Sequence, residues 1–182
     1  MIHHMSFGVR DPHRVAHALA ELMEAKPVRA PAPPFPYGAW LVVSGDERGS
    51  FLEILPATTV FDPDAPLGLR QRPAKSEPVT SHVLVSAAVP GEMIHAVAKR
   101  EGWQAEDIET GLFKIVKLWI DGNVLVEFLA KGEAGRYVDA FGAAGLSTLD
   151  EKLRHLEANL LTALSQKLPP QVLVEALGPR PA

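Results

Sequence analysis

The chain has 182 residues, of which 47% are hydrophobic and 22% charged, and its formal net charge is −4. That length is enough for one well-filled core or two small halves. The acidic balance offers no basic surface for nucleic acid, and no apolar stretch is long enough to span a membrane. No cysteine is present, which excludes disulfides and thiolate chemistry. With no signal-peptide pattern at the start, we expect a cytoplasmic protein.

Residues 1–56 predict a strand, a helix and further strands. The first strand runs to Val9, and Asp11-Pro12 then supplies a favoured helix cap and first helical residue. Five prolines within residues 26–37 predict a loop. Apolar residues at helical spacing mark the helix face, namely Val15, Ala18, Leu19, Leu22 and Met23. Two more strands are expected at 39–43 and 50–55.

Residues 80–131 repeat this order after a proline-rich linker at 57–79. A strand over 81–88 leads through Pro90-Gly91 into a helix, and a long strand is expected at 112–120. The Asp121-Gly122-Asn123 turn is a strong hairpin signal that opens the last strand. The chain therefore consists of two similar halves, followed by an extension.

The extension, residues 132–182, is expected to be helical. Thr148 and Glu151 have the spacing of a capping box, and Pro169-Pro170 ends the helix that follows. The helix carries a stripe of leucines at positions 149, 153, 156, 160 and 164. This stripe indicates packing on the helix's own domain or, alternatively, a contact between two copies in a homodimer.

Four polar residues lie inside the apolar strand runs of the two halves, in the order His4, Glu53, His82 and Glu127. An ionised carboxylate in such a strand is costly unless it is paired or bound to a metal. Two imidazoles and two carboxylates complete the ligand set of one divalent transition metal, with Ni, Zn, Mn, Fe and Co not distinguished. We therefore predict a metal site formed by these four side chains.

The same four residues are also compatible with purely structural roles. Each histidine could be satisfied by a backbone carbonyl. Either glutamate could form an ion pair across the sheet with a cationic side chain such as Arg10, Lys114 or Lys117. Strand alternation nevertheless places all four polar side chains opposite their apolar neighbours. It predicts a sheet with one face covered by helices and a polar concavity on the other.

The order and phase of these segments resemble the vicinal oxygen chelate superfamily, which includes glyoxalase I, methylmalonyl-CoA epimerase, extradiol dioxygenases and fosfomycin or bleomycin resistance proteins. The resemblance covers about residues 1–131 and includes the runs 81–86 and 121–128. It implies an α+β fold in which two βαβββ units form a curled mixed sheet around a metal-containing cup. No arginine faces the cup from the first strand, which speaks against glutathione as a substrate component.

The resemblance implies a glyoxalase-like metal-dependent isomerase, epimerase or lyase. Such an enzyme removes a proton from a small substrate chelated through vicinal oxygens, with Glu53 or Glu127 as the base. One alternative is an extradiol-type Fe(II) dioxygenase using His4, His82 and Glu127. Another is a non-catalytic, antibiotic-sequestering protein that binds small molecules in the same cup.

Overall fold

The computed structural model describes residues 3–32, 34–47, 49–61, 64–65, 68–73 and 82–172. Some predicted segments lie partly outside them. These are the start of the first strand at 1–2, the end of the linker and the start of the next strand at 74–81, and the end of the C-terminal extension at 173–182. The chain forms two compact units, Met1–Ala134 and Gly135–Ala182. Among the described helices, none has the length and apolar character needed to cross a membrane. The cytoplasmic location stays a prediction.

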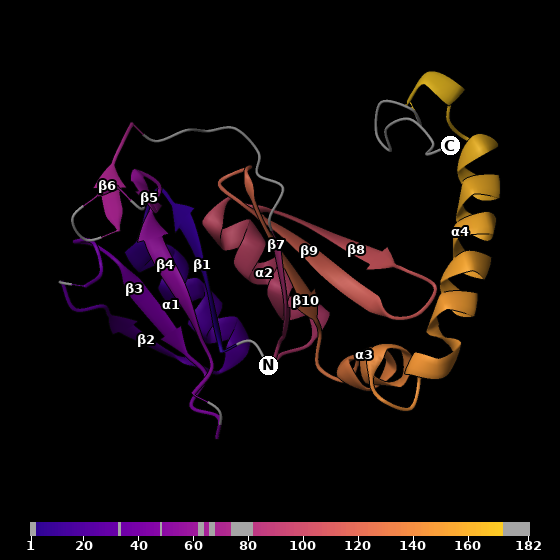
Figure 1. Cartoon of the computed structure of the whole chain (residues 1–182), viewed down its shortest axis with the longest axis horizontal. Helices are drawn as coiled ribbons and strands as arrows, with labels where there is room; N and C mark the ends of the chain where they lie inside the picture. Colours follow the sequence, from indigo (N-terminus) through magenta and orange to yellow (C-terminus); the bar gives the residue numbers. More distant parts are fainter. Residues whose placement is uncertain are drawn as a thin grey trace. The chain divides into compact units, whose positions relative to one another are not determined.

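The first unit contains the same order of elements twice (Figure 1). The first half comprises β1 (His4–Val9), α1 (Pro12–Met23), β2 (Lys26–Arg29), β3 (Trp40–Val43) and β4 (Phe51–Pro56). The second half comprises β7 (His82–Ser86), α2 (Gly91–Glu101), β8 (Gln104–Glu109), β9 (Lys114–Ile120) and β10 (Val124–Leu129). The predicted α+β fold with two βαβββ units is confirmed.

Each half forms a mixed four-stranded sheet, with the strand orders β1-β4-β3-β2 and β7-β10-β9-β8. In both sheets the first strand pairs in parallel with the last, β1 with β4 and β7 with β10. The other pairs are antiparallel. The strand that carries each predicted histidine therefore lies beside the strand that carries its glutamate.

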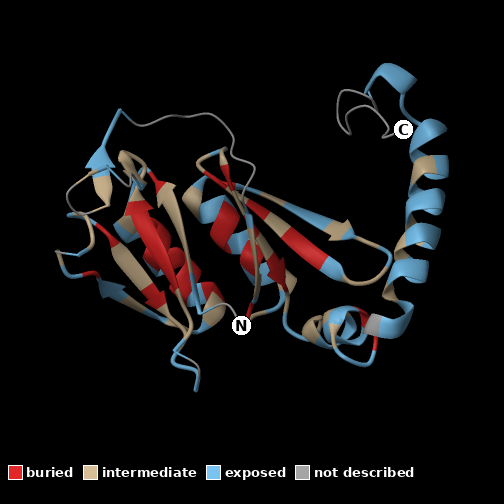
Figure 2. Cartoon of the chain, viewed as in Figure 1, coloured by how far each residue is buried: buried red, intermediate tan, exposed pale blue. Residues whose placement is uncertain are grey.

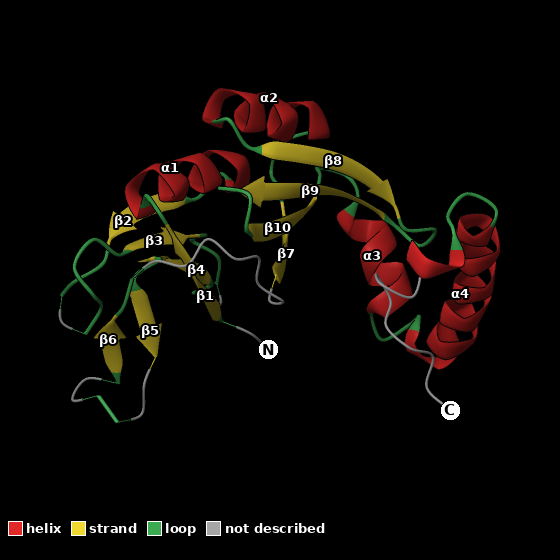
Figure 3. Cartoon of the chain, turned by 90° about the horizontal axis from the view of Figure 1, so that it is seen from above, coloured by secondary structure: helices red, strands yellow, loops and turns green. Residues whose placement is uncertain are grey.

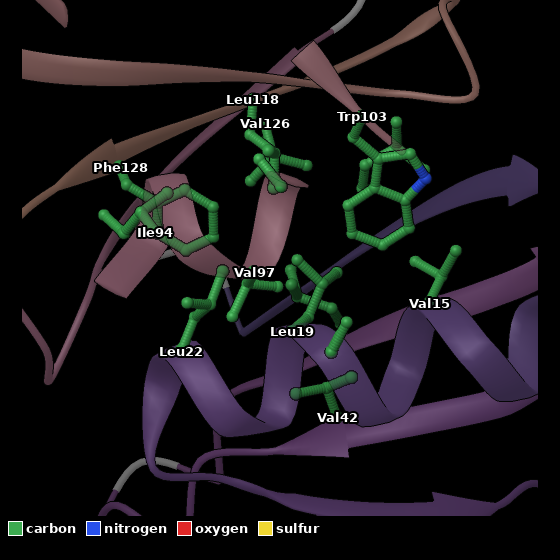
Figure 4. Close-up of a cluster of buried hydrophobic side chains, with 14 of the residues drawn as sticks. Val15, Leu19, Leu22, Val42, Ile94, Val97, Trp103, Leu118, Val126 and Phe128 are labelled. Atoms are coloured by element: carbon green, nitrogen blue, oxygen red, sulfur yellow. The ribbon is translucent and has the colours of Figure 1, made fainter. Parts of the chain in front are cut away.

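The two helices cover one face of the sheets, and in the described part of this unit no helix lies on the other face (Figure 3). Apolar side chains of α1, α2 and both sheets join in one core (Figure 4). Leu19, Ile94 and Phe128 are fully buried in it. Burial is concentrated on α1 and the inner strands (Figure 2). The predicted arrangement of helix-covered and open faces is thus observed.

Local signals explain where these elements begin and end. The Asp11 carboxylate accepts a hydrogen bond of 3.1 Å from the Arg14 backbone N–H, and Pro12 takes the first helical position. In the β9–β10 turn Asp121 and Gly122 have φ values of 52° and 76°. Two successive positive φ values are the requirement of a tight hairpin turn, which aspartate and glycine meet readily.

Two connections contain strands that the sequence did not indicate. Residues 26–37 are not all loop, because β2 occupies Lys26–Arg29. A proline is tolerated there because β2 is the edge strand of its sheet and pairs only with β3. The predicted linker at 57–79 holds a hairpin of β5 (Thr59–Phe61) and β6 (Leu69–Gln71). The division of the chain at residues 56, 79 and 131 stays a prediction.

A network of charged side chains joins α1 to α2. The Arg100 guanidinium donates to both carboxylate oxygens of Glu21, at 2.8 and 3.1 Å, and to Glu101 at 2.8 Å. Arg14 donates to Glu101 at 2.5 Å from the other helix. These hydrogen bonds, first from Arg100 and then from Arg14, hold the pKa of Glu101 below its usual value. The network therefore fastens the two halves to each other.

The Glu101→Gln substitution is expected to lower the free energy of unfolding at pH 7 by about 1 kcal/mol, the scale of a partly exposed ion pair. A depressed folded-state pKa stabilises the protein above the unfolded pKa of about 4.3, and that contribution is lost as the pH falls below it. Urea unfolding at pH 7 and at about pH 3.5 should therefore show the gap between variant and parent shrinking in acid. The control is Glu24→Gln, which removes a carboxylate at the C-terminus of α1 and should not be destabilising. A stability difference between Glu101→Gln and the parent that does not change with pH would contradict the role assigned to Glu101.

In its described part, the second unit contains all but the first residue of α3 (Ala134–Phe141), a 3-10 turn (Leu146–Thr148) and α4 (Leu149–Ser165). The helix start after Thr148 is as predicted, but the capping box is wrong. The Thr148 side chain makes no cap bond and donates instead to the Gly145 carbonyl at 3.2 Å. No residue of α4 is buried, and Leu160 of the predicted leucine stripe is 45% exposed. A role for this stripe between two copies stays a prediction.

Candidate metal centre

The first predicted pair, His4 and Glu53, lies on the adjacent parallel strands β1 and β4. Nε2 of His4 is 3.6 Å from Oε1 of Glu53. The other carboxylate oxygen accepts a hydrogen bond from the Ser6 hydroxyl. Glu53 is 8% exposed and is the only buried charged residue in the part of the chain that the structure describes. The His4 ring stacks on Phe51, its cross-strand neighbour, with centroids 4.9 Å apart.

The second pair, His82 and Glu127, repeats this arrangement on β7 and β10. Nε2 of His82 is 3.4 Å from Oε2 of Glu127, and the side chains are 50% and 15% exposed. The corresponding side-chain exposures in the first pair are close to these, 50% for His4 and 11% for Glu53. Both pairs thus combine an accessible imidazole with a largely buried carboxylate.

The strand register makes the two pairs equivalent. Glu53 lies opposite Ser6, two residues after His4, and Glu127 lies opposite Leu84, two residues after His82. The surroundings of the two glutamates differ chemically. The Ser6 hydroxyl holds Glu53 in place, whereas a leucine side chain has no group to hydrogen-bond Glu127.

The spacing within each pair fits two neighbouring ligands of one metal ion. The separations of 3.6 and 3.4 Å exceed the usual N–H···O range of about 2.7–3.2 Å. Nitrogen and oxygen ligands at about 2.0–2.2 Å from an ion stand about 2.8–3.6 Å from each other in octahedral or tetrahedral geometry. Ser6 supplies the kind of outer hydrogen bond that orients a ligating carboxylate. Each pair therefore has the donor chemistry and spacing of half a metal site.

The structure brings the four predicted residues together as two separate pairs, each of one histidine and one glutamate. Among the described residues, no three histidine, aspartate or glutamate side chains converge on one point. His4 and His82 border one hollow of about 500 Å³ between β1 and β7, but neither glutamate lines it. The ion-pair partners recorded for the glutamates are these histidines, although Lys117 neighbours Glu127 across the β9–β10 pair. The four-ligand site stays a prediction.

A second cavity, which we call the hairpin pocket, lies beside the first pair. It measures about 330 Å³ and is lined by His4, Ser6 and Glu53 together with Phe35, Phe61 and Leu69. The sequence pattern did not indicate the three apolar residues. Its only signal was the length of the two proline-rich connections, since long connections in a compact domain often border a binding site.

No family model matches this chain, and no curated protein matches it. Solved structures do match. The fosfomycin resistance protein FosX from Mesorhizobium loti is 16% identical, with 76% of this chain and 97% of that chain covered and a TM-score of 0.44. FosX from Listeria monocytogenes, solved with Mn(II) and sulfate, is 12% identical, with coverages of 78% and 96% and a TM-score of 0.48.

A possible glyoxalase from Bacillus cereus is 13% identical, with 71% of this chain and 98% of that chain covered and a TM-score of 0.44. A glyoxylase/bleomycin resistance protein/dioxygenase domain from Frankia also matches at 13% identity, with coverages of 71% and 96% and a TM-score of 0.44. These matched proteins belong to the vicinal oxygen chelate superfamily, which is the family that the sequence resembles.

Proposed function

We propose that this protein is a glyoxalase-like, metal-dependent enzyme of the isomerase, epimerase or lyase type, which removes a proton from a small substrate bound through vicinal oxygens. The observation that carries the proposal is the duplicated His–Glu pair at equivalent register, with donor spacings of 3.6 and 3.4 Å. His4, Glu53, His82 and Glu127 would hold the ion. A divalent ion held there would supply Lewis acidity toward two neighbouring oxygens of the substrate.

The four side chains would divide the work unequally. Glu53 is held by Ser6 on one oxygen and faces His4 with the other, so it suits a fixed position. Glu127 has the apolar Leu84 at the equivalent position and so lacks the serine hydrogen bond that holds Glu53, with Lys117 as its neighbour on the other side. We assign to Glu127 the role of the base that takes the substrate proton, and to Glu53 that of a fixed ligand.

A second copy of the chain belongs to the proposal. Each chain contains one pair of each kind, and the described residues do not bring three ligands to one point. We infer that a complete set joins the His4–Glu53 pair of one copy to the His82–Glu127 pair of another. Such an arrangement gives a twofold dimer two identical sites.

The proton-transfer role is tested by exchange of the α-protons of hydroxyacetone in D₂O, followed by proton NMR on zinc-loaded protein. Glu127→Gln is expected to slow exchange by about 100-fold or more, the usual contribution of a positioned base. Its zinc content, measured in parallel, is expected to stay above half, because the amide oxygen still occupies the site. Glu53→Gln, the matched variant, should reduce exchange less.

Each result decides the assignment. If proton exchange were slower in Glu53→Gln than in Glu127→Gln, Glu53 would be the base and Glu127 the fixed ligand. Undiminished exchange in both variants would rule out either glutamate as the base, and the absence of any exchange by loaded parent protein would favour a binding protein.

A further inference from the structure

The hairpin pocket combines two kinds of wall. On one side are the polar groups of the first pair, His4, Ser6 and Glu53. On the other side are apolar residues from segments outside the duplicated elements, namely the connection between β2 and β3 and the β5–β6 hairpin. The hairpin projects from the first sheet on the face opposite α1 (Figure 3). The apolar wall of the pocket is therefore built by connecting segments and not by the duplicated strands and helices.

Phe35 forms a fixed wall of this pocket. It packs against a small separate cluster of Ala30, Ala39 and Leu55. Its backbone N–H also donates to the Pro31 carbonyl at 3.2 Å. The ring is thus placed before any ligand arrives, which lowers the entropic cost of binding.

Phe61 forms an open wall at the end of β5. Its side chain is 67% exposed although it lines the pocket together with Leu69. An exposed aromatic ring beside a concave site commonly marks a surface that a ligand covers. Phe61 therefore has contact area available for a ligand and does little for the core.

The charge of the pocket restricts what can enter. Its described lining residues include no lysine or arginine, and Glu53 is their only acidic residue. Away from the ion that His4 and Glu53 would hold, an anionic group in this space would have apolar neighbours and no lysine or arginine among the described lining residues to pair with it. The pocket thus selects against phosphate, phosphonate or carboxylate on the part of a ligand that occupies it.

We propose that the hairpin pocket binds the uncharged, apolar body of the substrate, about one aromatic ring in size, while the vicinal oxygens face His4 and Glu53. This inference rests on the proposed function for the position of the oxygens. The volume of about 330 Å³ has room for one ring and part of the polar head, since a cavity of about 150 Å³ is enough to hold benzene.

The test compares three probes that share one α-hydroxyketone head: hydroxyacetone, 2-hydroxyacetophenone and 4-(hydroxyacetyl)benzoate. Affinities are measured by ligand-observed NMR titration of the full chain, with zinc and without it. The phenyl probe is expected to bind about 10-fold or more tighter than hydroxyacetone, since a buried ring removes apolar surface from water. The para-carboxylate should lose most of that gain.

Variants locate the effect. Phe61→Ala, at a position that is 67% exposed and expendable for folding, should remove most of the preference for the phenyl probe, and Phe35→Ala should act in the same direction. Tyr37→Ala is the control, because Tyr37 lies on the same connection as Phe35, is 89% exposed and does not line the pocket. It should leave all three affinities unchanged.

The outcomes separate this inference from the proposed function. Equal affinity for the phenyl and carboxylate probes, or a preference unaffected by Phe61→Ala, would overturn the pocket assignment. A phenyl preference that depends on Phe61, in parent protein that binds no zinc and exchanges no α-protons, would keep the pocket and refute the metal-dependent enzyme. Zinc-dependent proton exchange without any phenyl preference would do the reverse.

Discussion

Untagged protein loaded with zinc and freed of excess ion is expected to retain about one ion per chain, and His4→Ala and Glu127→Ala are each expected to lose it. Removing an outer hydrogen-bond partner of a ligand costs about 10–100-fold in metal affinity, so removing a ligand should cost more than about 100-fold. The two variants belong to different pairs and different sheets. Equal loss in both would mean that the two pairs serve one ion.

The chain offers a matched control for this measurement. His95 on α2 pairs with Asp107 on β8 at 2.9 Å, which is an ordinary hydrogen-bond length. His95→Ala should leave the metal content unchanged. All variants are made in a His17→Ala background, because His13 and His17 lie one turn apart on α1 and that spacing also chelates transition metals.

Elemental analysis after dialysis, with a zinc titration to obtain affinities, distinguishes the outcomes. A parent protein that keeps no ion after exposure to Zn, Ni, Mn or Fe salts would exclude the metal-dependent enzyme. Loss of metal in His4→Ala but full retention in Glu127→Ala would restrict the site to the first pair.

The elements that position the candidate site could be predicted because their signals are local. The Asp11-Pro12 start of α1 and the alternation along β1 and β10 each lie within a few residues. Strand alternation alone predicts that His4 and Ser6 lie on the same face of β1. The hydrogen bond from Ser6 to Glu53 shows that Glu53 lies on this face too. The repeat of these signals in the second half then indicated the duplicated sheet.

What could not be predicted depends on contacts between distant segments. The different surroundings of Glu53 and Glu127 follow from strand register, which places Ser6 opposite one and Leu84 opposite the other. Phe35 and Phe61 line one pocket only because two connections fold toward the same sheet. Whether His–Glu pairs converge is likewise decided by the placement of whole sheets.

The proposed assembly of the site from two copies predicts recovery of metal binding on mixing two inactive variants. His4→Ala/Glu53→Ala lacks the first pair, and His82→Ala/Glu127→Ala lacks the second, so neither contains a complete ligand set in any arrangement. A mixed dimer, however, holds one intact set and one empty one. Random exchange makes about half of the dimers mixed, so about a quarter of the parent's zinc content and proton-exchange rate should return.

The control is a mixture of the single variants His4→Ala and Glu53→Ala, which damage the same pair. No combination of these two chains restores an intact His4–Glu53 pair, so mixing them should recover nothing. Subunits are exchanged by co-refolding, and sedimentation velocity follows the oligomeric state. Dimeric protein in which the double variants fail to complement would place all four ligands within one chain, and a monomeric, metal-loaded parent would do the same. Recovery close to a quarter would instead show that the two halves of each chain serve different sites, because only the second copy can then supply the missing pair.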